Sequence, residues 1–249
     1  MEEISMSVKD VYLDYPSTVY NRKTLKQTVF ELIKLQKPQK VLHDVHALRG
    51  ISFEAKVGDR IGVIGHNGAG KSTLLKALSG IYPITGGEIS VNGNIQSLFD
   101  LSVGFEIDAT GRENIAYRGL LLGETPKSIQ EKTNDIINFA ELGEFIDYPV
   151  KSYSSGMIVR LAFAISTMVE GDILLLDEVF GAGDAKFAQK AKNRITGLVE
   201  SAKILVFVSH DFSAVRELCN RVIWMDHGLI KMDGNVEEVI NAYNTAMGI

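Results

Sequence analysis

The sequence has little of several features that define common protein classes. It contains one cysteine among 249 residues, Cys219, so no disulfide can form within the chain and a reducing compartment is the expected setting. Proline is scarce, with 5 residues, and the apolar content of 45% excludes a disordered or collagen-like chain. Apolar runs such as Ile173 to Leu176 are far shorter than the roughly 20 residues that cross a bilayer. The first residues also lack the basic and apolar regions of a signal peptide. We therefore expect a soluble protein that neither spans a membrane nor enters a secretory route by itself.

Charge is distributed unevenly along the chain. The formal net charge of −5 argues mildly against general nucleic-acid binding, yet residues 22–40 alone carry +5 and the remainder carries −10. Apolar residues at helical spacing beside lysines predict a short basic amphipathic helix over residues 24–35, ended by Pro38. Two interpretations stay open for this segment: a solvated face, or a surface set against anionic head groups, a permease or a pyrophosphate-bearing lipid. The basic residues are Arg22, Lys23, Lys26, Lys34, Lys37 and Lys40.

Strand patterns alternate with helix patterns over most of the chain, which indicates an α/β fold. Between residues 110 and 167 the pattern is predominantly helical, with Pro126 suited to a first helical turn and Gly143 suited to ending a helix. We expect a core over residues 1–108 and 168–249, with the basic insert at residues 17–44, and an inserted helical lobe over residues 109–167. The expected strands cover residues 4–12, 51–55, 60–64, 88–91, 95–99, 173–176, 204–208 and 221–226, and the expected helices of the core cover residues 72–79 and 185–200.

A glycine-rich segment follows the apolar strand expected at residues 60–64 and opens a helix, which is the context of a phosphate-binding loop. Its glycines let backbone N–H groups surround a β-phosphate, and the helix N-terminus adds a favourable dipole. Lys71 is expected to reach the β- and γ-phosphates, and the Ser72 hydroxyl to ligate Mg²⁺. The predicted phosphate-loop residues are Gly65, His66, Asn67, Gly68, Ala69, Gly70, Lys71, Ser72 and Thr73.

Two carboxylates end the apolar strand expected at residues 173–176. On its own such a pair is usually a strand meeting solvent, but together with a phosphate loop it indicates nucleotide hydrolysis. Asp177 is expected to hold the Mg²⁺ shell through water, and Glu178 to polarise the attacking water.

Two further segments are candidates for contact with the γ-phosphate because of where they lie in the sequence. Ser154, Ser155 and Gly156 precede a helix expected from about Ile158, and small residues at a helix N-terminus can contact a γ-phosphate, although a simple helix cap is the alternative. His210 ends the strand expected at residues 204–208, beside the carboxylate strand, where it is expected to contact the γ-phosphate or position water.

Taken in order, the phosphate loop, Tyr153 to Met157, Asp177-Glu178, Gly183-Asp184 and His210 resemble the ATP-binding subunit of an ABC transporter over essentially the whole chain. The resemblance implies a P-loop NTPase cassette: a RecA-like core with an N-terminal antiparallel β portion and a helical signature lobe. It also implies that Tyr15 stacks on adenine and that Asp184 lies in the loop that crosses a dimer interface. A second copy would supply Ser154 and Gly156 to each ATP, because one chain holds half of each site.

Two positions depart from the family pattern. The signature reads Tyr-Ser-Ser-Gly-Met where the family usually has Leu-Ser-Gly-Gly-Gln, so the hydroxyl of Ser154 and the open backbone of Gly156 are kept. The usual metal-coupling glutamine after the strand at residues 95–99 is missing, and Asp100 and Glu106 both stay open as its replacement.

The signature, residues 100–105 and residues 110–115 together resemble bacterial exporters of lipid-linked polysaccharide. This implies a peripheral ATPase homodimer at the cytoplasmic face of the inner membrane, working with an integral membrane permease and using ATP and Mg²⁺ to export an O-antigen. A capsule or teichoic acid polymer is the alternative cargo. Some O-antigen members carry a C-terminal carbohydrate-binding domain, which we expect to be absent here. A soluble ABC ATPase acting on DNA or ribosomes, and a plain P-loop kinase, are the rival classes, and we expect no nucleic-acid partner.

Overall fold

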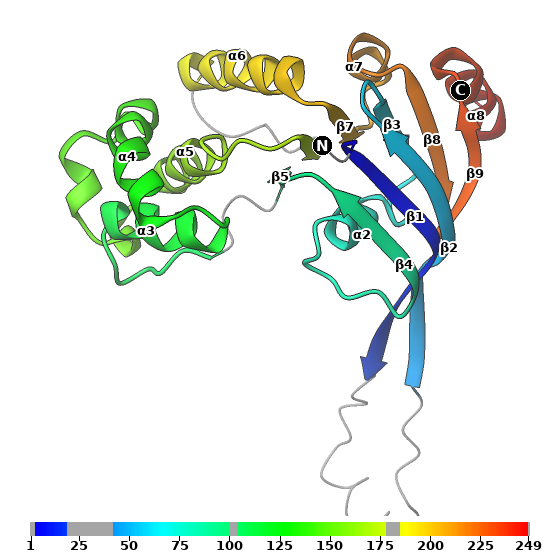
Figure 1. Cartoon of the computed structure of the whole chain (residues 1–249), viewed down its shortest axis with the longest axis horizontal. Coiled ribbons are helices and arrows are strands. Elements are labelled where there is room, and N and C mark those ends of the chain that lie inside the picture. Colours follow the sequence, from blue (N-terminus) through cyan, green and yellow to red (C-terminus); the bar gives the residue numbers. More distant parts are fainter. Residues whose placement is uncertain (1–2, 19–41, 100–103, 178–184, 249) are drawn as a thin grey trace, which may run out of the picture.

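The computed structural model describes residues 3–18, 42–99, 104–177 and 185–248 (Figure 1). The strands are β1 (Ser5–Thr18), β2 (Leu42–Lys56), β3 (Arg60–Ile64), β4 (Gly86–Asn92), β5 (Ile95–Leu98), β6 (Ile173–Asp177), β7 (Ile204–Val208), β8 (Arg221–Asp226) and β9 (Leu229–Gly234). The α-helices are α2 (Lys71–Leu78), α3 (Gly111–Leu121), α4 (Pro126–Ala140), α5 (Ser155–Ser166), α6 (Ala185–Ser201), α7 (Phe212–Leu218) and α8 (Val236–Met247). Two short 3₁₀ helices, η1 (Gly143–Asp147) and η2 (Val150–Ser152), precede α5.

A six-stranded sheet in the order β5-β6-β7-β3-β8-β9 forms the centre of the molecule, and all of its strands are parallel except β9. The central strands are apolar on both faces, as expected for parallel strands that are covered on each side. Successive side chains of β7 alternate between two clusters: Val206 packs with α2 and the second sheet, whereas Phe207 packs with α7 and α8. Strand β3, which precedes the predicted phosphate loop, therefore lies inside a sheet that is covered on both faces.

A second, antiparallel sheet has the order β2-β1-β4 and packs on the α2 side of the central sheet. Strand β1 pairs with β4 only as far as the Tyr12–Gly86 pair, but it pairs with β2 as far as the Thr18–Leu42 pair. The far end of β1 is therefore a two-stranded ribbon, which extends past β4 in Figure 1. Tyr15 lies on this ribbon.

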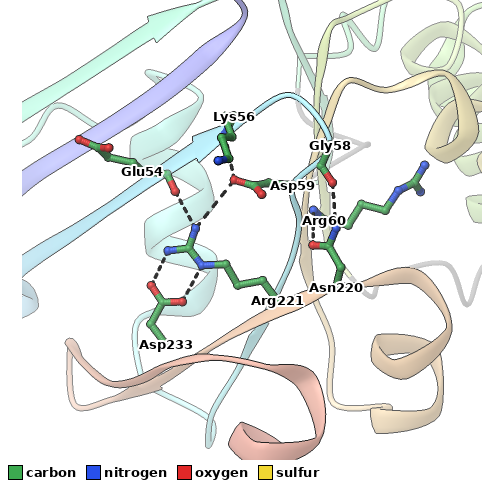
Figure 2. Close-up of polar contacts among 8 residues, drawn as sticks. All are labelled: Glu54, Lys56, Gly58, Asp59, Arg60, Asn220, Arg221 and Asp233. Carbon is green, nitrogen blue, oxygen red and sulfur yellow. Dashed lines mark hydrogen bonds and ion pairs between the residues drawn. The ribbon is translucent and has the colours of Figure 1, made fainter.

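The guanidinium of Arg221 joins the two sheets at the start of β8 (Figure 2). It donates to both carboxylate oxygens of Asp233 on β9, at 2.7 and 2.6 Å, and to the backbone carbonyl of Glu54 on β2 at 2.7 Å. Asp59 adds an ion pair at 3.9 Å, and Asn220 donates to the Gly58 carbonyl within the turn between β2 and β3 and accepts the Arg60 N–H at the start of β3. A bidentate pair has fixed geometry, so this network sets the position of β8 relative to β2.

Helices α3, α4 and α5 form a separate group with its own apolar cluster, to one side of the two sheets (Figure 1). Thr110 and Glu113 form a capping box at the start of α3, and Pro126 is in the first turn of α4, as its position in the sequence predicts. The helix-ending role expected of Gly143 is wrong by two residues. Glu141 takes the left-handed position after α4, with φ 51°, and its carboxylate pairs with Lys190 of α6 at 2.8 Å.

The strands expected at residues 60–64, 204–208 and 221–226 have those bounds in the structure. Helix α5 begins at Ser155, earlier than the expected Ile158, because the Ser154 side chain caps it. Helices α7 and α8 and strand β9 are not among the expected elements. The basic helix expected at residues 24–35 lies outside the described residues, and no described helix is long and apolar enough to cross a membrane.

Candidate active site

The predicted phosphate loop joins β3 to α2 in a backbone conformation that only glycine allows at its two ends. Gly65 has φ 149°, and a Cβ there would lie 2.2 Å from the carbonyl oxygen of Met225. Gly70 has φ 104°, and a Cβ there would lie 2.7 Å from the carbonyl oxygen of Ala47. At Gly68, by contrast, a Cβ would meet nothing within 4 Å, so this part of the loop faces open space. The loop therefore packs closely against the backbone at Gly65 and Gly70 and is accessible at Gly68.

Lys71 begins α2 and is buried, with 6% of its surface exposed. Its Nζ donates hydrogen bonds to the carbonyl oxygens of Gly65 at 2.7 Å and His66 at 2.9 Å. A buried ammonium that is held by carbonyls at the first turn of a helix is a preorganised positive charge beside N–H groups that have no acceptor within the helix itself. This arrangement provides an anion site of the kind that phosphate groups use.

Ser72 and Asp177 come from elements 105 positions apart and meet at this loop. The Ser72 hydroxyl donates to the Asp177 carboxylate with an oxygen–oxygen distance of 3.2 Å. Because β6 is parallel to β7 and two strands from β3, Asp177 lies at the same carboxyl edge of the sheet as the phosphate loop. A hydroxyl and a carboxylate are the hard oxygen ligands that Mg²⁺ prefers, so the residues present fit a magnesium site.

Tyr15 reaches the start of α2 from the β1 ribbon. Its hydroxyl oxygen lies 3.3 Å from the Thr73 hydroxyl oxygen, and its ring makes an edge-to-face contact with Tyr82 at 5.7 Å between centroids. The structure therefore places Tyr15 and Thr73, two predicted nucleotide-binding residues, in direct contact.

His210 and Ser154 lie on different elements. His210 is an exposed residue just after β7, and β7 pairs directly with β6, as the sequence predicts. Ser154 caps α5 by accepting the Met157 N–H at 3.2 Å, which leaves its hydroxyl proton for another acceptor. Ser154 and Ser155 are exposed, and a Cβ on Gly156 would meet only Ser154 Oγ at 3.9 Å, so the start of α5 is open to an incoming group.

Tyr153, the residue before the Ser154 cap, anchors the chain at the start of α5. It is buried in the helical group, where its hydroxyl donates to the Phe145 carbonyl at 2.6 Å, and burial raises the pKa of its phenol. Its role is therefore to anchor the backbone that presents Ser154.

Sequence reasoning missed Asn114, which fixes the segment ahead of α3. Its side chain is fully buried, accepts the Glu106 N–H at 2.8 Å, and donates to the carbonyls of Glu106 and Thr110, each at 2.9 Å. Glu106 is exposed. Asn114 follows polar residues that are typical of a protein surface, and nothing in the local sequence indicates that its side chain is buried and bonds the segment before α3. Glu178, Asp184 and Asp100 lie outside the described residues.

Comparison with known proteins gives a consistent set of relatives. Residues 48–181 match the family described as ABC transporter. The chain is 42% identical over 232 residues to the O-antigen export system ATP-binding protein RfbE of Yersinia enterocolitica, covering 91% of this chain and 96% of that one. It is 40% identical over 226 residues to the O-antigen export system ATP-binding protein RfbB of Myxococcus xanthus, covering 91% of this chain but only 52% of that protein.

A teichoic acids export ATP-binding protein, TagH of Lactococcus lactis, is 44% identical over 200 residues, covering 80% of this chain and 43% of its own length. The chain thus spans nearly all of some curated relatives and about half of others. Among solved structures, a dimeric ATP-binding cassette bound to ADP and phosphate matches 93% of this chain and 98% of its own length, with a TM-score of 0.66 and 20% identity. The ATP-binding subunit of an ABC transporter matches 96% of this chain and 93% of its own length, with a TM-score of 0.68 and 17% identity.

Proposed function

This chain belongs to the ABC transporter family and is one of its ATPase cassettes, and from that premise we propose that it powers export of a lipid-linked polysaccharide through a separate membrane permease. The observation that carries the ATPase function is the meeting of Lys71, Ser72 and Asp177 at one edge of the central sheet. The division into a nucleotide-binding core (residues 1–108 and 168–249) and a signature lobe (residues 109–167) is part of the same proposal.

Nucleotide phosphates bind the loop through its outward N–H groups, while the buried ammonium of Lys71 balances their charge. Tyr15 stacks on the adenine, in a position fixed by its contacts with Thr73 and Tyr82. Ser72 would ligate Mg²⁺, and Asp177 would hold it through water. The metal, when bound, would neutralise charge on the β- and γ-phosphates.

Hydrolysis requires two further residues. Glu178, which directly follows Asp177, polarises the attacking water, and His210, after the adjacent strand, contacts the γ-phosphate. Because β6 and β7 are paired and parallel, Asp177 at the end of β6 and His210 just after β7 lie at the same carboxyl edge of the sheet.

The site is completed by a second copy of the chain. Ser154, Ser155 and Gly156 lie on the helical group, which stands apart from the phosphate loop of the same chain (Figure 1). Their exposure and the free hydroxyl proton of Ser154 suit them to a γ-phosphate on a partner chain, and Asp184 completes the contact between copies. The dimeric cassette with ADP and phosphate supports this arrangement.

The cargo proposal rests on the relatives. The O-antigen export proteins are similar over up to 98% of their own length, which favours lipopolysaccharide O-antigen as the polymer and the cytoplasmic face of the bacterial inner membrane as the location. The teichoic acid export proteins, of comparable identity, make a teichoic acid polymer the second candidate.

Glu178→Gln tests the catalytic proposal. We expect the variant to bind ATP, form a stable dimer in size-exclusion chromatography and release phosphate at least about 100-fold more slowly than the parent. Glu170→Gln, a carboxylate change in the turn before β6, is the matched control and leaves hydrolysis unchanged. Normal phosphate release by Glu178→Gln would refute the assignment.

A deletion strain tests the cargo. We expect lipid-linked O-antigen to accumulate in the cytoplasm, and the tagged chain to co-purify with an integral membrane permease. Accumulation of a teichoic acid polymer would select the second candidate. Normal polymer export, with co-purification of nucleic acid, would refute both.

A further inference from the structure

Behind the phosphate loop, two histidines and an aspartate gather at the turn between β8 and β9. His66 belongs to the loop, and Asp226 and His227 form the end of β8 and the turn, 160 positions later. One ligand atom from each residue lies within 4.8 Å of the other two. His66 Nε2 is 3.0 Å and His227 Nε2 is 3.7 Å from the same carboxylate oxygen, Asp226 Oδ1. Three atoms that can ligate a metal ion therefore lie close together.

The hydrogen bonds of His66 require either a proton or a metal ion at this point. Its Nδ1 lies 2.7 Å from the Asn67 carbonyl oxygen, and because a carbonyl can only accept, Nδ1 carries a hydrogen. In a neutral imidazole Nε2 then presents a lone pair, yet it faces a carboxylate oxygen at 3.0 Å. Two acceptors at that distance need a proton or a metal ion between them. An Nδ1–H to carbonyl bond is also how proteins orient a metal-binding histidine.

The backbone at His227 is a second, independent observation. The hairpin closes with the two-residue turn His227-Gly228, and both residues have positive φ, 48° and 77°. Such turns favour Asn-Gly, and histidine is one of the few other residues that are enriched at positive φ. The turn holds the imidazole of His227 beside the His66 ring, with 4.8 Å between centroids and 55° between the ring planes.

We propose that His66, Asp226 and His227 form a binding site for a transition-metal cation of the Zn²⁺ class, separate from the Mg²⁺ site at Ser72 and Asp177. Two imidazole nitrogens and one carboxylate oxygen suit zinc, with water as the fourth ligand, and do not suit magnesium. Ligand atoms around tetrahedral zinc lie roughly 3.3 Å apart. The distances of 3.0 and 3.7 Å from the two histidine nitrogens to Asp226 Oδ1 lie on either side of that value. The His227 side chain is exposed and can move to bring its nitrogen into ligand distance.

The surrounding charges suit this role. Lys231 Nζ lies 3.4 Å from Asp226 Oδ2, so it holds the other carboxylate oxygen and leaves Oδ1 to the cation. An aspartate is ionised at neutral pH, and the nearby Lys231 ammonium favours the charged form of Asp226, so the carboxylate is available as a ligand.

A metal at this site links the phosphate loop to the β8–β9 hairpin. The two already share one backbone bond, Gly228 N–H to the Ala69 carbonyl at 2.9 Å. A metal would add a second connection, made by side chains, and would thereby restrict the movement of His66 in the phosphate loop. Zinc binding therefore stabilises the folded chain without nucleotide.

His227→Asn is the sharpest test, because asparagine fits the positive-φ turn and removes the imidazole ligand. Chelator-treated protein is titrated with zinc sulfate by calorimetry, without ATP, and thermal unfolding is measured with and without zinc. We expect one zinc per chain at micromolar concentration, and binding at least about tenfold weaker in His227→Asn. Excess Mg²⁺ does not displace the zinc.

His46→Asn is the matched control. His46 pairs with Asp14 at 2.7 Å but is not part of the described three-residue cluster, so its loss leaves zinc affinity unchanged. Absence of stoichiometric zinc binding would overturn the proposal and assign the position between His66 and Asp226 to a proton. Equal zinc affinity in His227→Asn and the parent, or equal losses in both variants, would overturn it as well. ATP is absent throughout, so the result does not bear on the ATPase proposal.

Discussion

Replacing Asn114 by leucine should destabilise the fold more than its position in a polar run of the sequence suggests. Leucine is close to asparagine in size but makes no hydrogen bonds. In the structure the fully buried Asn114 side chain accepts the Glu106 N–H and donates to the carbonyls of Glu106 and Thr110. The two carbonyls have other donors, from Ala109 and from the α3 backbone, whereas among the described residues the Glu106 N–H has Asn114 as its sole acceptor.

The expected magnitude follows from this inventory. The part-buried Glu106 N–H loses its partner at a cost of up to about 3 kcal/mol, and each further lost hydrogen bond contributes about 1 kcal/mol. The leucine methyl groups recover part of this by apolar burial against the helical cluster. We therefore expect a loss of about 2–4 kcal/mol in the free energy of unfolding, which for a chain of this size lowers Tm by roughly 4–16 °C.

Thermal unfolding followed by circular dichroism measures this change. Asn134→Leu, at an exposed position of α4, is the control and should stay within about 0.5 kcal/mol of the parent. If Asn114→Leu unfolds at the same temperature as Asn134→Leu, the hydrogen bonds of Asn114 do not hold the segment before α3, and the reasoning fails.

Three further predictions concern the phosphate loop, helix packing and the single thiol. Lys71→Ala removes the buried ammonium of the loop and should lower ATP hydrolysis at least about 100-fold in a phosphate-release assay, with an unchanged circular dichroism spectrum. Gly119→Ala places a Cβ 2.7 Å from a side-chain carbon of Ile129 and should cost about 1–3 kcal/mol in urea unfolding, whereas Gly197→Ala, with nothing within 4 Å, should be neutral or stabilising. Burial raises the pKa of the Cys219 thiol to about 12, so below that pH the thiol stays protonated, and at pH 8 a thiol reagent should label it only after unfolding in urea.

The parts of the site that the sequence predicts are those that depend on local chain geometry. The phosphate loop is one such part, because its glycines fix the backbone between a buried strand and a helix. The strand containing Val206 is another, since a continuous apolar run bounded by polar residues has one reasonable length. The pairing of the Asp177 strand with the His210 strand is also confirmed.

Other features depend on partners far along the chain, and no local pattern encodes them. Asn114 acquires its role from the segment that folds against it, and His66 meets Asp226 only after the whole sheet has formed. Helix α4 ends at Ala140, and Glu141 takes the left-handed position after it, while its carboxylate pairs with Lys190 of another helix. Sequence position alone favours glycine at the end of this helix.

The ribbon at the far end of β1 has a consequence for how a nucleotide meets this protein. Beyond Tyr12 the strand is paired on one side only, and two strands alone are marginally stable in water. Its amide hydrogens should therefore exchange with solvent much faster than those of β3 and β7, which are enclosed on both faces. Tyr15 lies on the fast-exchanging part, whereas Lys71 is anchored to the slow one. The base of a bound nucleotide would thus contact the least protected backbone of the core and its phosphates the most protected, so ligand binding should quench local opening mainly at the ribbon.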